Sequence, residues 1–265
     1  HKYLRSGVMV NGLFVRSEEG TPQGGPLSPL LSNVMLNELD KELGRRGLPF
    51  VRYADDSMIF CRSKRAAERV RESITNFIEG RLHLKVNKEK TVVSYVRGVK
   101  YLGYSFYINK GKCLLTVHPK TKAKMRRRLK ELTGRSNGMG YAKRKKELRL
   151  YIKGWVNYYH LATMKRLTEE TDEWLRRRLR MCIWKSWKLP KTRIKNLIKC
   201  GINKYNARRW GCVKGYWRVA GSPIMHVAAS NVNLRKAGYT FLYDEYVKWL
   251  PKRGTAVCGT ARTVV

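Results

Sequence analysis

The chain has 265 residues, of which 43% are hydrophobic and 11% aromatic, and it carries 57 Lys and Arg against 19 Asp and Glu. This apolar content excludes a disordered basic tail and predicts a folded protein with a real core. The formal net charge of +38 indicates a polyanionic partner, most naturally a nucleic acid, because Lys and Arg neutralise phosphates and release counterions. A membrane partner is not expected, since the chain has no run of about 18 apolar residues.

The positive charge is concentrated in the second half of the chain. Residues 1–118 hold 20 basic and 11 acidic side chains, a net of +9, whereas residues 119–218 hold 31 and 6, a net of +25. We therefore expect the nucleic-acid-binding surface mainly after residue 118. The six cysteines form no CxxC pair, which argues against zinc and indicates reduced thiols in a cytoplasmic protein.

Up to residue 118 the pattern predicts strands interrupted by helices. Asn11-Gly12 between two apolar runs predicts a β-hairpin. A helix is expected to follow, with Ser28 as its N-cap and Pro29 at its first position, and a second helix is expected after Ser63. Strands are expected at 50–54, 57–61, 84–86, 91–96, 100–108 and 113–117.

Beyond residue 118 the apolar residues recur with a period of 3.6, which predicts helices. Long helices are expected near 119–133, 141–161 and 168–188, joined by short links as in a bundle. Shorter helices follow, and the last 15 or so residues show little periodicity. The predicted fold class is therefore α+β: an antiparallel sheet with helices, followed by an all-α region.

Two adjacent aspartates, Asp55 and Asp56, lie between apolar strands in the segment VRYADDSMIF. One alternative is structural, because Asp in a tight turn often bonds the local backbone. Against it, adjacent carboxylates repel each other, and residues 53–60 contain no Lys or Arg to neutralise them. A divalent cation is the simplest partner, and paired Mg²⁺ ions promote phosphoryl transfer. The hairpin is therefore a candidate metal site.

The loop before the first long helix, EGTPQGGP, is unusually rich in Gly and Pro. Gly lets the backbone approach a ligand closely, and Pro stiffens the path of the chain. Gln23 adds a hydrogen-bond donor and an acceptor on this support. The alternative is a rigid connection into the helix, which alone would not need this density of Gly and Pro.

These segments together resemble a known family. EGTPQGGPLSPLLSNVMLNELD, YADD, LKVNKEKT and KYLGYSF, in this order, are similar to the palm of a group II intron reverse transcriptase, also called a maturase. LRLYIKGWVNYYHLA and TDEWLRRRLRMCIWKSWK resemble its maturase-specific thumb, and GCVKGYWRVAGSPIMHVAASNVNLRKAGY resembles the segment that follows. The resemblance implies a partial right-hand polymerase palm at 1–118, a helical thumb at 119–190, a small, mainly helical basic region at 191–250 and a tail at 251–265.

The resemblance also assigns roles to residues. Asp55 would ligate the two catalytic Mg²⁺ ions, and Asp56 would assist or bind them less directly. Nucleotide and template would contact Pro22, Gln23, Gly24, Gly25, Ala54 and Lys90, and the primer would be gripped by Tyr101, Leu102, Gly103 and Tyr104. RNA would contact the basic runs Arg126, Arg127, Arg128, Lys143, Arg144, Lys145, Lys146, Arg176, Arg177 and Arg178, whose structural alternative is a solvated helix surface.

The implied function is RNA-directed DNA synthesis from an RNA template, a DNA primer and dNTPs, at a DNA target. The protein would also bind its group II intron RNA to promote splicing and mobility, in the cytoplasm of a bacterium, with a homodimer as one possible working unit. An alternative is a maturase that only binds RNA and whose polymerase site has decayed. A diversity-generating reverse transcriptase is a further alternative, which the maturase-like thumb disfavours.

The family places another metal-binding Asp on a strand upstream of the PQGG motif, and no Asp precedes Asp40 in this chain. The chain also begins without Met. We therefore expect residues 1–265 to be part of a longer protein that has its fingers and this Asp upstream. On that expectation, residues 1–265 alone do not polymerise.

Overall fold

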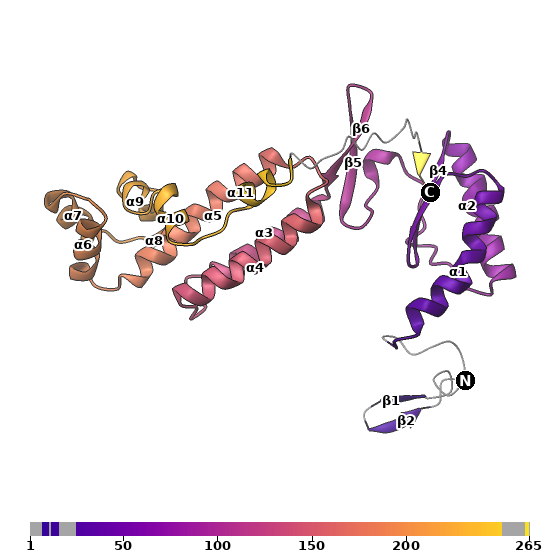
Figure 1. Ribbon diagram of the computed structural model, residues 1–265, viewed down its shortest axis with the longest axis horizontal. Helices are drawn as coiled ribbons and strands as arrows, with labels where there is room; N and C mark the ends of the chain where they lie inside the picture. The colour runs from indigo at the N-terminus through magenta and orange to yellow at the C-terminus, as the bar shows by residue number, and fades with distance from the viewer. Residues whose placement is uncertain (1–6, 11, 16–24, 251–262, 265) are drawn as a thin grey trace. The chain divides into compact units, whose positions relative to one another are not determined.

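The computed structural model describes residues 7–10, 12–15, 25–250 and 263–264 (Figure 1). The chain divides into two compact units. The first comprises residues 1–101, 110–113 and 258–265, and the second comprises residues 102–109 and 114–257. None of the described helices is both long and apolar enough to cross a bilayer.

The first unit combines short antiparallel strands with two long helices. Its elements are β1 (Val8–Val10), β2 (Leu13–Val15), α1 (Ser28–Arg45), β3 (Phe50–Tyr53), β4 (Asp56–Cys61), α2 (Lys64–Arg81), the 3₁₀ turn η2 (Val96–Gly98) and β7 (Thr263–Val264). β1 pairs with β2, which confirms the hairpin at Gly12, whose φ is +83°. β4 pairs antiparallel with β3 on one edge and with β7 on the other.

The helices of the first unit bury their apolar stripes against the β3–β4 hairpin. The core contains Leu39 and Leu43 of α1, Ile59 of β4, Ile74 of α2, and Leu82. Burying side chains of this size contributes about 1.5–3 kcal/mol each, which fixes the hairpin on the two helices.

The two predicted helix caps have different outcomes. Ser63 caps α2 as predicted, because its hydroxyl accepts a hydrogen bond from the Ala66 amide at 3.2 Å. The prediction for Ser28 is wrong by one residue: Leu27 occupies the cap position of α1 without a side-chain hydrogen bond. The Ser28 hydroxyl instead donates to the Gly25 carbonyl at 3.1 Å, which closes the turn that enters the helix.

The strands predicted at 84–86 and 91–96 are not formed. Residues 84–95 run as an irregular segment with one turn and an isolated bridge residue, Ser94. Asn87 organises the turn, since its backbone carbonyl accepts hydrogen bonds from the Lys90 and Thr91 amides. Leu84 packs on the core of this unit, so its burial does not require a strand.

The second unit is predominantly helical. Its elements are α3 (Pro119–Leu132), α4 (Tyr141–Tyr159), α5 (Lys165–Ser186), α6 (Pro190–Lys199), α7 (Lys204–Gly211), α8 (Tyr216–Ala220), α9 (Pro223–Ala228), α10 (Asn231–Lys236) and α11 (Leu242–Val247), together with most of the two-stranded sheet β5 (Tyr104–Asn109) and β6 (Lys112–Val117). The three long helices predicted after residue 118 are confirmed within a few residues of their expected ends.

One continuous core holds the helices of the second unit together. It includes Leu129 of α3, Ile152 of α4, Leu179 of α5 and residues of the later helices, such as Leu197 and Met225, all at most 1% exposed. The core therefore continues across residue 190, where the thumb is predicted to end.

Candidate active site

The two aspartates lie at the tip of the β3–β4 hairpin. Tyr53 pairs with Asp56, so Ala54 and Asp55 form a two-residue turn. Ala54 has φ +53°, a left-handed conformation that is uncommon for a residue with a side chain. Backbone strain of this kind persists only where surrounding contacts hold it, and it is frequent at functional sites.

Arg52 supplies those contacts. Its guanidinium donates to both carboxylate oxygens of Asp40 on α1, at 2.8 and 2.5 Å, and to the Asn33 side chain at 2.8 Å. The same group donates to the Ala54 carbonyl at 2.9 Å. The turn that carries Asp55 is thereby tied to α1 through a planar, bidentate ion pair. These three partners were missed in the sequence, although Arg52 directly precedes the YADD motif.

Both aspartate side chains are exposed, and within the described part of the chain neither forms an ion pair or a hydrogen bond to the turn backbone. The turn is stabilised by Arg52 instead, so the structural role for Asp in turns does not explain this pair. Two adjacent carboxylates with free oxygens are suitable ligands for hard cations such as Mg²⁺.

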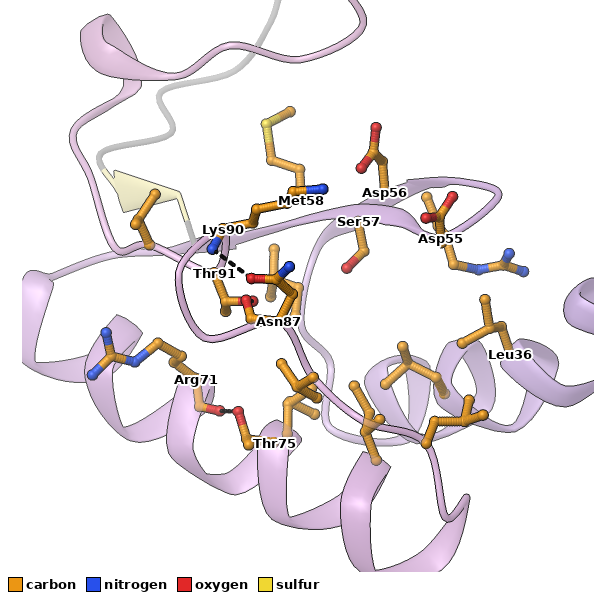
Figure 2. Close-up of a pocket in the computed structure, with 18 of the residues that line it drawn as sticks. Leu36, Asp55, Asp56, Ser57, Met58, Arg71, Thr75, Asn87, Lys90 and Thr91 are labelled. Atoms are coloured by element: carbon orange, nitrogen blue, oxygen red, sulfur yellow. Dashed lines mark hydrogen bonds between the residues drawn. The ribbon is translucent and has the colours of Figure 1, made fainter. Parts of the chain in front are cut away.

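Asp55 and Asp56 line a cavity of about 650 Å³ in the first unit (Figure 2). This volume lies in the range typical of small-molecule sites. The floor is apolar, with side chains of α1, β4 and α2, whereas five basic residues line the cavity besides the two aspartates: Arg52, Arg71, Lys85, Lys90 and Lys100. An excess of cations around two carboxylates suits a polyanionic ligand accompanied by metal ions.

Lys90 reaches the cavity from the segment 84–95. Its amide donates to the Asn87 side chain at 3.1 Å, and the Thr91 hydroxyl donates to the Asn87 carbonyl at 2.9 Å. Figure 2 shows Asn87, Lys90 and Thr91 of this turn close together, and Asp56 and Ser57 extending from opposite sides of β4. The predicted Lys90 and the predicted aspartates thus line the same cavity.

Tyr101, a predicted primer-grip residue, also lines this cavity. Its hydroxyl is buried and has no hydrogen-bond partner among the described residues. Burial, and secondarily the negative charge of Asp56, raises the pKa of Tyr101 above its ordinary value. The phenol therefore stays neutral at physiological pH.

The other predicted grip residues, Leu102, Gly103 and Tyr104, form a strained turn held by α4. Leu102 and Gly103 have φ of +50° and +82°. The Tyr104 hydroxyl donates to the Tyr158 carbonyl, and the Tyr158 hydroxyl donates to the Leu102 carbonyl at 3.2 Å. These reciprocal bonds fix the turn against the helix.

The PQGG residues are only partly described. Pro22, Gln23 and Gly24 lie outside the described residues. Gly25 is half-buried, and its carbonyl accepts hydrogen bonds from the amide and hydroxyl of Ser28.

The basic runs divide into exposed residues and residues engaged by the fold. Exposed members are Arg126, Arg127, Arg128, Lys143 and Lys146. Arg128 pairs with Glu131 at 3.1 Å, and half-buried Lys145 donates to the Ala237 carbonyl at 3.0 Å. Arg176 and Arg177 stack over Phe241 and Trp217, with guanidinium carbons 5.0 and 4.3 Å from the ring centroids.

Arg144 and Arg178 have structural roles that the sequence did not reveal. Arg144 is only 6% exposed and donates to the Leu132 carbonyl and the Asn137 side chain, both at 3.3 Å. Arg178 donates to the Thr133 hydroxyl at 2.6 Å and to the carbonyls of Lys130 and Thr133 at 3.0 Å. Both side chains satisfy carbonyls at the C-terminus of α3, so their guanidinium groups are already committed.

Two family models match the chain. A model for reverse transcriptase (RNA-dependent DNA polymerase) matches residues 1–106, and a model for the group II intron maturase-specific domain matches residues 122–201. The first model covers the candidate active site, and the second covers most of α3 and all of α4, α5 and α6. The chain belongs to the group II intron-encoded reverse transcriptase/maturase family.

Several curated proteins are similar to parts of this chain. The group II intron-encoded protein LtrA of Lactococcus lactis subsp. cremoris is 25% identical over 175 residues, covering 42% of this chain and 29% of that protein. Protein YkfC of Escherichia coli strain K12 is 33% identical over 138 residues, covering 39% and 36%. The retron Ec86 reverse transcriptase of Escherichia coli is 37% identical over 79 residues, covering 28% and 24%. The chain thus spans between 24% and 36% of the length of these relatives.

Reverse transcriptases are nucleotidyltransferases that generally use Mg²⁺. The described part of this family member contains no group of three or more His, Cys, Asp or Glu placed to hold a metal ion. Its two hairpin carboxylates fit Mg²⁺ by their chemistry, since this ion binds through one or two carboxylates plus water and substrate phosphates.

Proposed function

We propose that this protein is the RNA-directed DNA polymerase of a group II intron, which extends a DNA primer on an RNA template with dNTPs. The proposal is carried by two exposed carboxylates at the tip of the β3–β4 hairpin, which line a basic cavity and have no ion-pair partner among the described residues. Membership of the reverse transcriptase family supports the reaction, and the cavity's size and charge support a nucleotide as its ligand.

In this proposal Asp55 and Asp56 hold two Mg²⁺ ions, which supply charge stabilisation for in-line phosphoryl transfer when bound. Lys90 lines the same cavity, where its cation would balance negative charge on the triphosphate. Arg52 positions the carboxylates by holding the Ala54 carbonyl. Pro22, Gln23 and Gly24, with Gly25 and Ala54, would contact nucleotide and template, and residues 101–104 would hold the primer.

The helical second unit would bind the intron RNA and so promote splicing and mobility in the bacterial cytoplasm. Its exposed cations support this part of the proposal: Arg126, Arg127, Arg128, Lys143 and Lys146. Such contacts reach phosphates and supply affinity, whereas RNA shape and unpaired bases supply selectivity. Stabilising the active RNA fold needs no protein catalysis, because any ligand of a folded state stabilises that state.

A second candidate is a maturase that binds RNA without polymerising. It is favoured by one observation: among the described residues the hairpin carboxylates have no third acidic side chain beside them. We propose that a further carboxylate comes from a longer form of the protein, and that residues 1–265 alone do not extend a primer.

Primer extension on an RNA template with Mg²⁺ tests the proposal. The upstream-extended protein is compared with its Asp55→Ala variant and with Glu72→Ala, an exposed acidic residue of α2 outside the cavity. We expect extension by the parent and by Glu72→Ala, and loss of at least about 100-fold in Asp55→Ala. RNA binding without extension by any protein would favour the non-catalytic maturase instead, and extension by residues 1–265 alone would refute the need for an upstream carboxylate.

A further inference from the structure

A second cavity, of about 160 Å³, lies in the helical unit. It is formed where the loop between α3 and α4 meets the C-terminal end of α5. Its walls are Arg135, Asn137, Gly138, Met139, Arg144, Cys182, Lys185, Ser186 and Lys188. The roles assigned above use only Arg144 from this set, and use it to satisfy the end of α3.

The cavity is strongly basic. Four of its lining residues are Arg or Lys, and no acidic residue is among the described residues that line it. Arg144 is 94% buried, yet its described hydrogen-bond acceptors are neutral, a carbonyl and an amide oxygen. Buried charges are normally paired, since desolvation of an unpaired charge is costly. Among the described residues, the site therefore has no counter-charge.

The walls are held in place by hydrogen bonds. Asn137 donates to the Glu131 carbonyl at 2.9 Å and accepts from the Met139 amide at 3.1 Å, which shapes the loop. The Lys185 ammonium donates to the Arg135 carbonyl at 2.7 Å, and Ser186 bonds the Tyr141 hydroxyl. The cavity is thus preorganised, so a ligand would not have to order it.

We propose that this cavity binds one phosphate group, and that in the working protein the group belongs to the RNA backbone. The volume equals that of about five water molecules, which suits a phosphate but falls short of the roughly 300 Å³ at which drug-sized ligand sites begin. Arg and Lys side chains are the usual recognition groups for phosphate, and four of them line this cavity. The choice of RNA as its source rests on the proposed function of this unit.

The test uses two matched double variants of the full chain. Arg135→Gln/Lys188→Gln removes two exposed cations from the cavity, whereas Arg149→Gln/Lys195→Gln removes two exposed cations elsewhere in the same unit. Both lose the same charge, so both weaken non-specific RNA binding to a similar extent. Unfolding midpoints without ligand verify that each variant folds.

Inorganic phosphate at constant ionic strength is the first probe, and a short fluorescein-labelled RNA is the second. We expect phosphate to raise the unfolding midpoint saturably in the parent and in the control, but not in the cavity variant. We expect the cavity variant to bind the RNA about tenfold more weakly than the control does.

Three outcomes would overturn the proposal in whole or in part. A phosphate response that persists in the cavity variant would refute the site itself. A lost phosphate response with RNA affinity equal to that of the control would refute RNA as the source and leave a site for free anions. If the parent does not bind RNA at all, the proposed function of this unit fails, while the phosphate measurement still decides whether the site exists.

Discussion

Arg52 holds Asp40 through two hydrogen bonds, at 2.8 and 2.5 Å, and thereby joins the β3–β4 hairpin to α1. The pair is mostly shielded from solvent, with side-chain exposures of 12% and 26%. The carboxylate holds the pKa of Arg52 above its ordinary value. The same guanidinium also donates a hydrogen bond to the Ala54 carbonyl. The positions of Asp55 and Asp56 therefore depend on the pair between Arg52 and Asp40.

Arg52→Lys should therefore destabilise the hairpin, since Lys cannot form the bidentate pair and reach Ala54 at the same time. We expect a loss of about 1–2 kcal/mol in the free energy of unfolding, measured by chemical denaturation. Arg97→Lys, at an exposed position of η2, is the control and should change stability by less than about 0.5 kcal/mol. Equal effects of the two substitutions would show that the hydrogen bonds of Arg52 to Asp40 and Ala54 do not contribute to stability.

Gly103 lies where a side chain would collide with α4. A Cβ atom there would overlap the Tyr159 hydroxyl and come within 3.2 Å of the Thr121 hydroxyl. Gly111 has a similar backbone, with φ +74° against +82°, but open space around it. Gly103→Ala should therefore cost about 1–3 kcal/mol more unfolding free energy than Gly111→Ala, because only the first adds overpacking to backbone strain. Equal losses would mean that Tyr159 moves aside.

Arg144 should be sensitive to a change that keeps its charge. Arg144→Lys removes the guanidinium group that donates to the Leu132 carbonyl and the Asn137 side chain, but it keeps the buried positive charge. We expect a loss of about 1–3 kcal/mol in the free energy of unfolding. Arg149→Lys, on an exposed position of the same helix, should be nearly neutral. A neutral Arg144→Lys would contradict the structural role given to this residue.

Asp172 should make stability depend on pH. Its buried carboxylate accepts hydrogen bonds from the Leu242 and Tyr243 amides at 2.9 and 2.8 Å, which caps α11. Burial nevertheless raises its pKa from 3.8 to about 6. Between pH 4 and 6 the folded state therefore binds the proton more tightly than the unfolded state, and stability falls as pH rises through this window.

Asp172→Asn should remove this contribution. We compare the free energy of unfolding of the parent with that of the variant at each pH. Relative to the variant, the parent should be about 2 kcal/mol more stable at pH 4 than it is at pH 7. Glu173→Gln, the exposed neighbour, should show no such change. Denaturation at a series of pH values measures both, and a difference that does not vary with pH would refute the raised pKa.

The sequence by itself determined the local elements and the family. Apolar runs on either side of Asp55 and Asp56 predicted the hairpin, Ser63 predicted the start of α2, and the helical period after residue 118 predicted the long helices. These features follow from backbone conformation and short-range hydrogen bonds, so neighbouring residues suffice to specify them. The ordered motifs around YADD and the thumb-like helices likewise identified the family.

Only the tertiary structure decided which partner each side chain has. The apolar segments 84–86 and 91–96 satisfy a strand pattern, yet a strand also needs a neighbour with free backbone groups, and Asn87 turns the chain instead. In the same way, a run of basic residues does not reveal that Arg144 is buried while Lys143 beside it is exposed. Burial and pairing depend on contacts between different elements, such as that of Arg52 on β3 with Asp40 on α1. The periodicity of apolar residues predicts which face of an element is buried, but not which other element packs against that face.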